Sequence, residues 1–504
     1  MAYRTATSKR LGRLPALLLL ASASGCTLGP DFVRPDDGLA TVQLSARGDY
    51  DTDGRTTSES TPVRWWDLFN DPVLTSLQAD AQATNLDLLL AAERIQESRA
   101  QLGIASSDLL PSVGGSAAYA REANSANGKF AALGAPTSAS DFWQTGLDAS
   151  WEIDLWGRAR RAREGAEATL EASIYGREVA RAALAAEVAR NYLMLRGTQS
   201  QLDVTRQNLE VADRSLSIAE NRQRNGVGTA FETASARAQL ATTRSLVPEL
   251  TQRRNALVNA LALLLGQEPR ALDARLMMAM PLPVLPSNIP VGVPSELARR
   301  RPDIRRAEAQ LHAATAAIGV AKADFYPRIG LRGRIGVEAF EGRDLGSWDS
   351  RTFSVGPTVY LPIFQGGRLK QRLALNESRQ RSAAISYRQT VLSAWHEVDD
   401  ALDGWSAQRA HHEDAEVAYE ENLLALHAAE RGYREGATDY LSVLTAQRGL
   451  LASQSALNTS ATNSALAVVR LFKSLGGGWD STAFARADEA GGRPARGHEG
   501  GSGP

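Results

Sequence analysis

The spacing of apolar residues along the chain alternates between two periods. Long stretches place apolar side chains at helical spacing, whereas after Pro111 and after Pro327 they fall at every second position. Within the long stretches the apolar residues recur every seven positions, at Val188, Leu195, Leu202, Leu209 and Leu216 and again at Val391, Val398, Trp405, His412, Tyr419, Leu426 and Tyr433. In the first stretch, small residues lie three positions after the last four of these apolar residues, at Thr198, Thr205, Ala212 and Ala219. A seven-residue period is typical of helices wound on their neighbours as a coiled coil.

The helical stretches form two copies of one hairpin. Gly226 and Gly436 each interrupt a long helical run, and the helices that follow them end at Leu265-Gly266 and Leu475-Gly476, so that corresponding residues lie 210 positions apart. Glycine suits such a reversal because the residue after a helix often needs a positive φ. We expect long helices over 158–225 and 368–435, each on the order of 100 Å, since an α-helix rises about 1.5 Å per residue. Return helices about half as long should cover 229–265 and 438–475.

Two further helices are expected before the alternating segments, over about 72–109 and 294–325. Asp71 is a suitable N-cap for the first of them, with Pro72 at the first helical position. The chain then divides into a signal peptide (1–25), an extended N-terminal segment (26–71), a first repeat (72–293), a second repeat (294–476) and a disordered tail (477–504).

Four segments alternate apolar and polar residues and predict strands of roughly 9 to 11 residues, the length of a strand tilted across a bilayer. They cover 113–119, 143–153, 329–337 and 353–361. Charges on one face and Trp or Ile on the other favour a lumen lined by Asp148, Glu152, Arg332 and Arg334. A half-buried soluble sheet has the same alternation and stays an alternative. Because lipid tolerates no open sheet edge, four membrane-spanning strands must be pooled by several subunits. The expected fold class is therefore α+β.

The first residues have the pattern of a secretory signal. Lys9, Arg10 and Arg13 precede an apolar run over 14–21, which is too short for a transmembrane helix, and the run ends at Ala23-Ser-Gly-Cys26. Small residues before a lone cysteine resemble a bacterial lipobox, in which the thiol receives a diacylglyceryl group and the new N-terminus an acyl chain. We therefore expect a covalent lipid on Cys26. An ordinary signal peptide with an incidental cysteine is the alternative.

The composition gives no support for several other classes of protein. The formal net charge is −1, which gives no reason to expect nucleic-acid binding, and a single cysteine allows no internal disulfide. The six histidines are scattered; His411-His412 resembles a metal pair, but His412 lies on the seven-residue seam, which favours packing. No catalytic constellation and no phosphate loop emerge, so we expect neither an enzyme nor a metal or other cofactor.

A set of motifs in order resembles the TolC-type outer membrane factors, with the lipid-anchored NodT subgroup as the best match. Beside the lipobox, the resemblance rests on Gly29-Pro-Asp-Phe-Val-Arg-Pro35, Trp66-Asp-Leu-Phe-Asn-Asp-Pro72, Arg301-Pro-Asp-Ile-Arg-Arg-Ala-Glu308, Phe325-Tyr-Pro327, Leu361-Pro-Ile-Phe-Gln-Gly-Gly-Arg368 and Tyr433-Arg-Glu-Gly436. It covers roughly residues 12 to 476. The resemblance implies a homotrimer in which each protomer supplies four strands to a twelve-stranded outer-membrane barrel and its helices to a periplasmic tunnel of twelve helices.

The resemblance also implies a function and a set of partners. The trimer would be the exit duct of a tripartite efflux pump for small molecules and drugs. It would dock with a periplasmic adaptor and an inner-membrane transporter, and the expected class of transporter is the RND type. Thr27 after the cysteine, in place of Asp, would direct the lipoprotein to the outer membrane. A type I protein secretion channel and a periplasmic coiled-coil protein without a pore are the alternatives.

The same resemblance places the closed end of the duct at the two hairpin tips. These tips are Asn225, Gly226, Val227, Gly228 and Thr229 in the first copy and Glu435, Gly436, Ala437, Thr438 and Asp439 in the second. Related channels often carry acidic gate residues just inside the second tip, where this chain has Ser442 and Thr445. We therefore expect Glu232 and Asp439 to supply the charge near the gate, with Ser442 and Thr445 completing a weaker ring.

Overall fold

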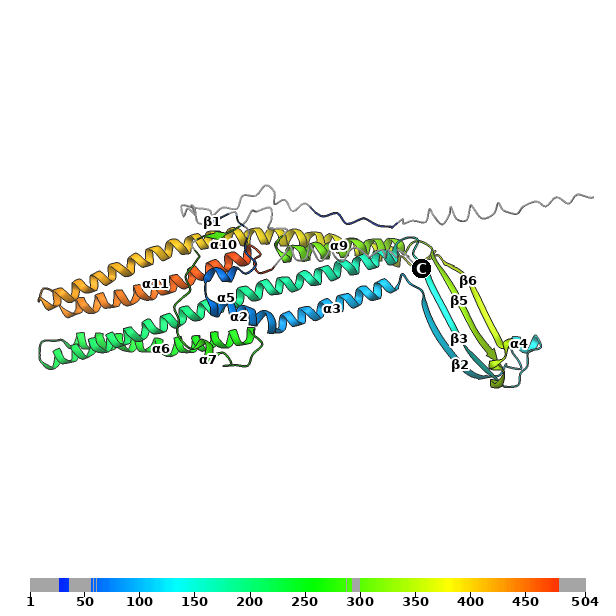
Figure 1. Ribbon diagram of the computed structural model, residues 1–504, viewed down its shortest axis with the longest axis horizontal. Coiled ribbons are helices and arrows are strands. Elements are labelled where there is room, and N and C mark those ends of the chain that lie inside the picture. Colours follow the sequence, from blue (N-terminus) through cyan, green and yellow to red (C-terminus); the bar gives the residue numbers. More distant parts are fainter. Residues whose placement is uncertain are drawn as a thin grey trace, which may run out of the picture. The chain divides into compact units, whose positions relative to one another are not determined.

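The computed structural model describes residues 27–35, 56–57, 59, 61–286, 288–291 and 300–479 (Figure 1). The signal peptide, Cys26 and residues 480–504 of the expected tail lie outside the described residues, so the expectations about them stay predictions. The described chain forms two compact units. One contains 27–35, 94–173 and 307–387 and includes the sheet; the other contains the described residues of 36–93, 174–306 and 388–479 and includes both hairpin tips.

The two long hairpins are present as expected, and their helices have the same lengths. Helices α5 (Arg158–Arg224) and α10 (Arg368–Arg434) are each 67 residues long, and the return helices α6 (Ala230–Leu264) and α11 (Tyr440–Ser474) are each 35. Both turns lie at the same end of their unit (Figure 1). The predicted coiled-coil seam is buried at Val188, Leu195, Leu202, Val391, Val398, Trp405 and Leu426, and so are its small partners Thr198, Thr205, Ala212 and Ala219.

The main core joins residues that are far apart in the sequence. The short 3₁₀ helix η2 (Trp65–Phe69) buries its aromatic side chains, and the Trp65 ring stacks on Phe472 of α11 at 5.3 Å between centroids. Helix α2 (Pro72–Thr84) begins with the expected cap, because Asp71 accepts hydrogen bonds from the Val73 and Leu74 amides at 2.8 and 3.0 Å. The buried Tyr192 of α5 also donates to Asp71, at 2.6 Å. Burial and this hydrogen bond raise the pKa of Tyr192, which keeps its hydroxyl protonated.

The helix expected over 72–109 is in fact two helices. α2 ends at Thr84 and α3 (Leu86–Ser107) begins after Asn85, whose backbone is extended. The Asn85 side chain accepts a hydrogen bond from the Leu88 amide at 3.1 Å and donates to the Leu264 carbonyl at 2.9 Å. An Asn side chain that bonds the backbone locally competes with the helix, and this explains the break. In the second repeat α9 covers Pro302–Ala323, and the expected helix over 294–325 is interrupted at Arg301, since Arg300 is again helical; its residues 294–299 lie outside the described part.

The strands form one antiparallel sheet in the order β2-β3-β5-β6. They are β2 (Ser112–Glu122), β3 (Ser140–Ile153), β5 (Arg328–Ala339) and β6 (Arg351–Tyr360), which confirms the four predicted segments. A two-residue parallel pair joins β1 (Thr56–Thr57) to β4 (Ile289–Pro290). The remaining elements are short: α4 (Lys129–Ala132), α7 (Asp273–Leu276), η3 (Gly342–Gly346) and η4 (Trp348–Ser350). The α+β class is therefore confirmed.

The Trp65–Phe472 contact predicts a large stability effect. Replacing Trp65, whose exposed fraction is 0%, by Ala should lower the free energy of unfolding by about 3–5 kcal/mol, because it removes a buried aromatic ring and leaves a cavity. Urea denaturation of the detergent-extracted protein measures this. The control is Trp348→Ala, a tryptophan that is 76% exposed, which should change stability by less than about 0.5 kcal/mol. Equal effects of the two substitutions would contradict the packing described here.

Candidate functional site

The sheet has one polar and one apolar face, and the strand register assigns each residue to its face. Directly opposite residues such as Asp148 and Arg334 share a face. The polar face carries Ser112, Ser116, Gln144, Asp148, Ser150, Glu152, Arg332, Arg334, Glu338, Thr352, Ser354 and Thr358. The apolar face carries Val113, Tyr119, Trp143, Leu147, Trp151, Leu331, Ile335, Phe353, Val355 and Val359, all of which are exposed in the protomer. One chain therefore presents a broad apolar surface that must meet an apolar environment.

All four residues predicted to line a lumen lie on this polar face. Asp148 is the cross-strand partner of Arg334, with 3.8 Å between a carboxylate oxygen and the guanidinium Nε, and it also accepts from the Ser116 hydroxyl at 3.3 Å. Glu152 pairs with Arg158 at 3.0 Å. Arg332 lies opposite Ser150 and is exposed. The four residues thus share one surface of the sheet.

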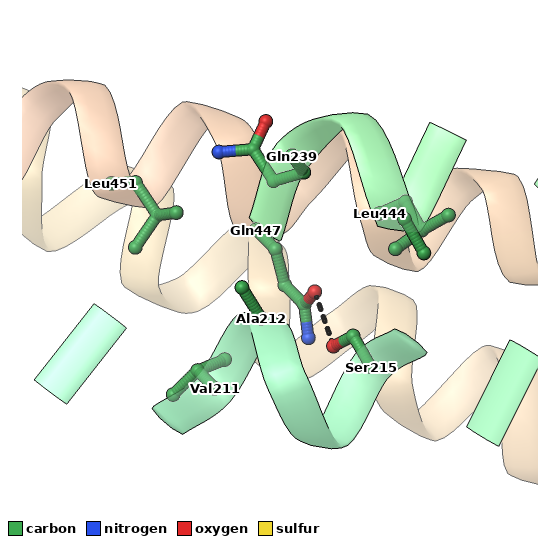
Figure 2. Close-up of a pocket in the computed structure, with 8 residues that line it drawn as sticks. Val211, Ala212, Ser215, Gln239, Leu444, Gln447 and Leu451 are labelled. Atoms are coloured by element: carbon green, nitrogen blue, oxygen red, sulfur yellow. Dashed lines mark hydrogen bonds between the residues drawn. The ribbon is translucent and has the colours of Figure 1, made fainter. Parts of the chain in front are cut away.

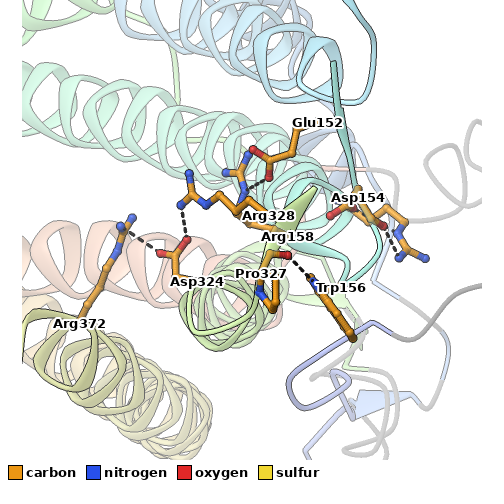
Figure 3. Close-up of polar contacts among 9 residues, drawn as sticks. Glu152, Asp154, Trp156, Arg158, Asp324, Pro327, Arg328 and Arg372 are labelled. Carbon is orange, nitrogen blue, oxygen red and sulfur yellow. Dashed lines mark hydrogen bonds and ion pairs between the residues drawn. The ribbon is translucent and has the colours of Figure 1, made fainter. Parts of the chain in front are cut away.

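Polar contacts brace the junction where the strands continue into helices (Figure 3). The indole of Trp156 donates to the Pro327 carbonyl at 2.8 Å and so joins the first repeat to the second. Asp324, only 4% exposed at its side chain, pairs with Arg328 at 2.8 Å and with Arg372 at 3.2 Å. Asp154 pairs with Arg160 at 3.3 Å (Figure 3). Two guanidinium groups, one from the start of β5 and one from α10, thus converge on a single buried carboxylate and link these elements.

Residues 27–35, here called the N-terminal strap, bind the same junction. The Leu28 amide donates to the Trp156 carbonyl at 3.1 Å, and the Leu28 carbonyl accepts from Arg161 at 3.3 Å. Further contacts are an ion pair of Asp31 with Arg161, a stack of Phe32 on His312 at 4.5 Å and an ion pair of Arg34 with Glu308 at 2.7 Å. Gly29 has a φ of +99°, and a Cβ there would meet the backbone of Gly319 at 2.5 Å. The strap therefore ties α5 of the first repeat to α9 of the second.

The two hairpin tips reverse the chain in the same way. Gly226 has a φ of 74° and Gly436 a φ of 73°, which confirms the left-handed conformation expected from the sequence. After each glycine, backbone amides return to a carbonyl of the preceding helix: Val227 to Arg222 at 3.0 Å and Ala437 to Gly432 at 2.8 Å. Most of the ten tip residues are exposed, Gly228 being the half-buried exception. At Gly228 a Cβ would meet Arg222 at 2.8 Å, so only glycine fits.

Three of the four predicted gate residues, Glu232, Asp439 and Ser442, take part in starting the return helices. Glu232 forms a capping box with Thr229, with both hydrogen bonds at 3.2 Å. Asp439 is the N-cap of α11 and accepts from the amide and the hydroxyl of Ser442 at 2.9 and 2.7 Å. Thr445 donates to the Leu441 carbonyl at 2.8 Å. Each polar group thus has a local structural role, whether or not it also faces a passage.

One residue that joins the two tips was not predicted from the sequence. Arg222, near the end of α5, lies over the rings of Tyr433 and Tyr440 with its guanidinium carbon 5.1 and 5.8 Å from their centroids. It also donates to the Tyr433 hydroxyl and, at 3.0 Å, to the Val227 carbonyl. We call this group the tip clasp (Arg222, Tyr433 and Tyr440). Only Tyr433 had a signal in the sequence, as the last residue of the seven-residue seam.

Above the tip clasp the hairpins are closely packed. Ser215 of α5 donates to the Gln447 amide oxygen of α11 at 3.0 Å, and the Tyr440 hydroxyl donates to the Ser215 carbonyl at 3.0 Å. Figure 2 shows the Ser215–Gln447 bond among apolar neighbours that include Leu444 and Leu451. The enclosed space there is about 10 Å³, at the limit for one water molecule. This part of the hairpin pair therefore offers no room for a solute.

Neither a metal centre nor a membrane-spanning helix is found where the chain is described. His412 contacts the Ser460 hydroxyl at 2.8 Å through Nδ1, and His411 is exposed. Among the described residues no three His, Cys, Asp or Glu side chains are grouped so as to hold a metal ion. No helix in the described part combines the length and the apolarity that crossing a membrane requires.

Comparison with known proteins decides the family. The family described as outer membrane efflux protein matches residues 77–267 and 293–477. The chain belongs to this family. The two matched ranges together cover most of the chain and reproduce its internal duplication.

Individual relatives agree along nearly the whole chain. Outer membrane protein OprJ of Pseudomonas aeruginosa is 32% identical over 472 residues, which cover 92% of this chain and 95% of OprJ. Nodulation protein T of Rhizobium leguminosarum is 29% identical over 479 residues, covering 95% and 96%. The solved outer-membrane channel OprN superimposes with a TM-score of 0.83 at 33% identity, over 90% of this chain and all of that chain. This efflux protein is thus an outer membrane factor, and its function is efflux through the outer membrane.

The cap at Asp439 predicts a pH-dependent tip. Its hydrogen bonds from Ser442 hold the pKa of Asp439 below the ordinary 3.8, so the cap is complete above that value and is lost as the pH falls through the lowered pKa. Hydrogen exchange should therefore show the first turn of α11 losing protection only in strong acid. The Asp439→Ala variant should lack this protection at every pH, whereas the Thr445→Ala variant should keep it. Asp439→Asn, which caps without titrating, should remove the pH dependence; a persisting acid transition in that variant would contradict the assignment.

Proposed function

We propose that three copies of this chain form the exit duct of a tripartite efflux pump, a passive channel that performs no chemistry. The observation that carries the proposal is the sheet. In the described residues β2 and β6 each have one edge without a strand partner, and the two faces differ in polarity. Four strands from each of three copies make a barrel of twelve, which pairs every edge, turns the apolar face to lipid and turns the polar face to a water-filled lumen.

The helical hairpins supply the periplasmic part of the duct and its docking end. Val227 of the first tip and Phe231 in the first turn of α6 are each 65% exposed and suit an apolar contact with a partner. We assign this end to a periplasmic adaptor that connects the duct to an inner-membrane transporter, with the RND type as the expected class. The closely packed hairpin pair above the tip clasp contains no solute pocket, so the choice of exported small molecules falls to the transporter.

The tip clasp is the element that keeps the periplasmic end narrow in this proposal. It is the contact by which Arg222 of the first hairpin holds Tyr433 and Tyr440 of the second. Glu232 and Asp439 supply negative charge beside it, and Ser442 and Thr445 the neutral part of the ring. Separation of the hairpins must break a hydrogen-bonded cation–π contact, which is worth about 1–2 kcal/mol in a partly desolvated place.

Single-channel recording in planar bilayers, together with native mass, tests this proposal. The wild-type protein should be a trimer with small, flickering conductance, and Arg222→Ala should raise that conductance several-fold by freeing the tips. Arg237→Ala is the control, because Arg237 pairs with Glu220 within one hairpin at 2.9 Å. Glu232→Ala with Asp439→Ala should reduce cation preference. Unchanged conductance and preference in that double variant would refute the gate assignment, and a monomer that never conducts would refute the duct.

We also propose that the protein is anchored by lipid on Cys26. The position of the strap supports this, because Thr27, the next residue, lies against Gly157, where a Cβ would come within 2.9 Å of the Thr27 Cα. Gly157 follows β3 at the end from which α5 starts. An acyl group one residue before Thr27 would therefore enter the membrane beside the periplasmic rim of the barrel. Two or more chains at this point give stable anchoring.

Metabolic labelling measures the lipid directly. In cells fed radioactive palmitate the wild-type protein should be labelled, and Cys26→Ser should lose the label and keep its signal peptide uncleaved. Ser24→Ala, two residues away, is the matched control and should remain labelled. A Cys26→Ser protein that is processed and reaches the outer membrane normally would show that an ordinary signal peptide suffices.

A further inference from the structure

The polar face of the sheet carries more ionisable groups than it pairs. They are Glu122, Asp148, Glu152, Arg328, Arg332, Arg334 and Glu338. Four of the seven are engaged: Asp148 with Arg334, Glu152 with Arg158, and Arg328 with Asp324. Within the part of the chain that the structure describes, Arg332, Glu122 and Glu338 have no ion pair or side-chain hydrogen bond. The uncompensated charge of this face is therefore carried by one arginine and two glutamates.

The arginine and the glutamates lie at different heights of the sheet. Arg332 pairs in register with Ser150, towards the ends of the strands that lead to the helices. Glu338 pairs with Gln144 and Glu122 with Ser140, near the loops at the other end. Six residues of strand separate Arg332 from Glu338, about 20 Å at 3.3 Å per residue. That distance exceeds two Debye lengths at physiological ionic strength, about 8 Å each, so the opposite charges do not cancel.

The neighbours of Arg332 leave its guanidinium free to meet a solute. On one side its register partner is Gly356, which has no side chain and open space where a Cβ would stand. On the other side is Ser150, whose hydroxyl is in contact with that of Ser112 at 2.9 Å. Its diagonal neighbours Asp148 and Glu152 are the only acids within reach on β3, and both are already held by other arginines. The net charge around Ser150 is thus positive.

We infer that Arg332 determines the charge preference of the helix-proximal half of the lumen and favours solutes that carry an anionic group. This rests on the proposed function, in which the polar faces of three copies surround one lumen. Three Arg332 side chains then form a positive ring at the level of Ser150, while Glu122 and Glu338 form an acidic zone nearer the outer mouth. A carboxylate, sulfonate or phosphate group gains from a guanidinium that forms no ion pair of its own among the described residues. Cationic solutes gain nothing at this level.

Thiol reactivity at Ser150 measures the local potential. The full-length protein with Ser150→Cys, in lipid nanodiscs, is treated with an anionic sulfonatoethyl or a cationic trimethylammonioethyl methanethiosulfonate, and modification of residue 150 is followed by peptide mass. With Arg332 present the anionic reagent should react faster relative to the cationic one. Arg332→Gln should lower that rate ratio about tenfold, as expected for one unit charge about 5 Å away acting oppositely on the two reagents. Arg332→Lys should keep the ratio, and 1 M salt should shrink the difference.

Matched variants separate the possible failures. Removing a paired couple, with Asp148→Asn and Arg334→Gln together, leaves the net charge unchanged and should alter the ratio less than about twofold. Ala149→Cys, on the apolar face, should be inert to both reagents in lipid. If Ser150→Cys reacts but the ratio of anionic to cationic modification rates is unchanged by Arg332→Gln, the inference about Arg332 is wrong and the proposed duct is unaffected. If Ser150→Cys is inert and Ala149→Cys reacts, the faces are reversed, and the proposed lumen fails together with the inference.

Discussion

The unpaired edges of β2 and β6 are the constraint on which the rest of the molecule depends. A backbone amide or carbonyl without a partner is tolerated in water but costs several kcal/mol in hydrocarbon. A sheet with an apolar face therefore cannot enter a membrane as one chain, and assembly has to come with insertion. In the proposed duct the duplicated helices serve that requirement, since the two hairpins of each chain have equal lengths and can supply similar units to a ring. The braces at the junction, among them Asp324 and Trp156, keep strands and helices aligned.

Periodic features of the fold could be predicted from the sequence, and single-residue features could not. The seven-residue seam, the glycine turns and the four strands follow from patterns that extend over many residues, and each is present. The break at Asn85 was missed because one side chain that bonds the Leu88 amide and the Leu264 carbonyl leaves the apolar period unchanged. The tip clasp was missed for a similar reason: Arg222 is one of many arginines, and only the three-dimensional turn brings it to Tyr433 and Tyr440.

The candidate site shows why residue type alone assigns roles poorly. Acidic and hydroxyl residues just after a turn suit a charged gate, but the same residues are preferred helix N-caps. At Glu232 and Asp439 the structure shows the capping bonds, so their capping role is established and their gating role is a proposal. On the sheet, by contrast, the residue pattern was sufficient to assign side chains to a face. The alternation assigned the four predicted residues to the polar face, and the register then showed which charges are paired.

The stack of Trp65 on Phe472 joins the beginning and the end of the helical architecture. The first of these rings leaves the ribosome roughly 400 residues before the second, so the core around it stays open during almost all of synthesis. A truncated chain that lacks α11 leaves Trp65 and its neighbours without a cover. Such a product exposes apolar surface of the kind that chaperones and proteases recognise. The first aromatic cluster is therefore buried only once α11 has been made and has packed against it.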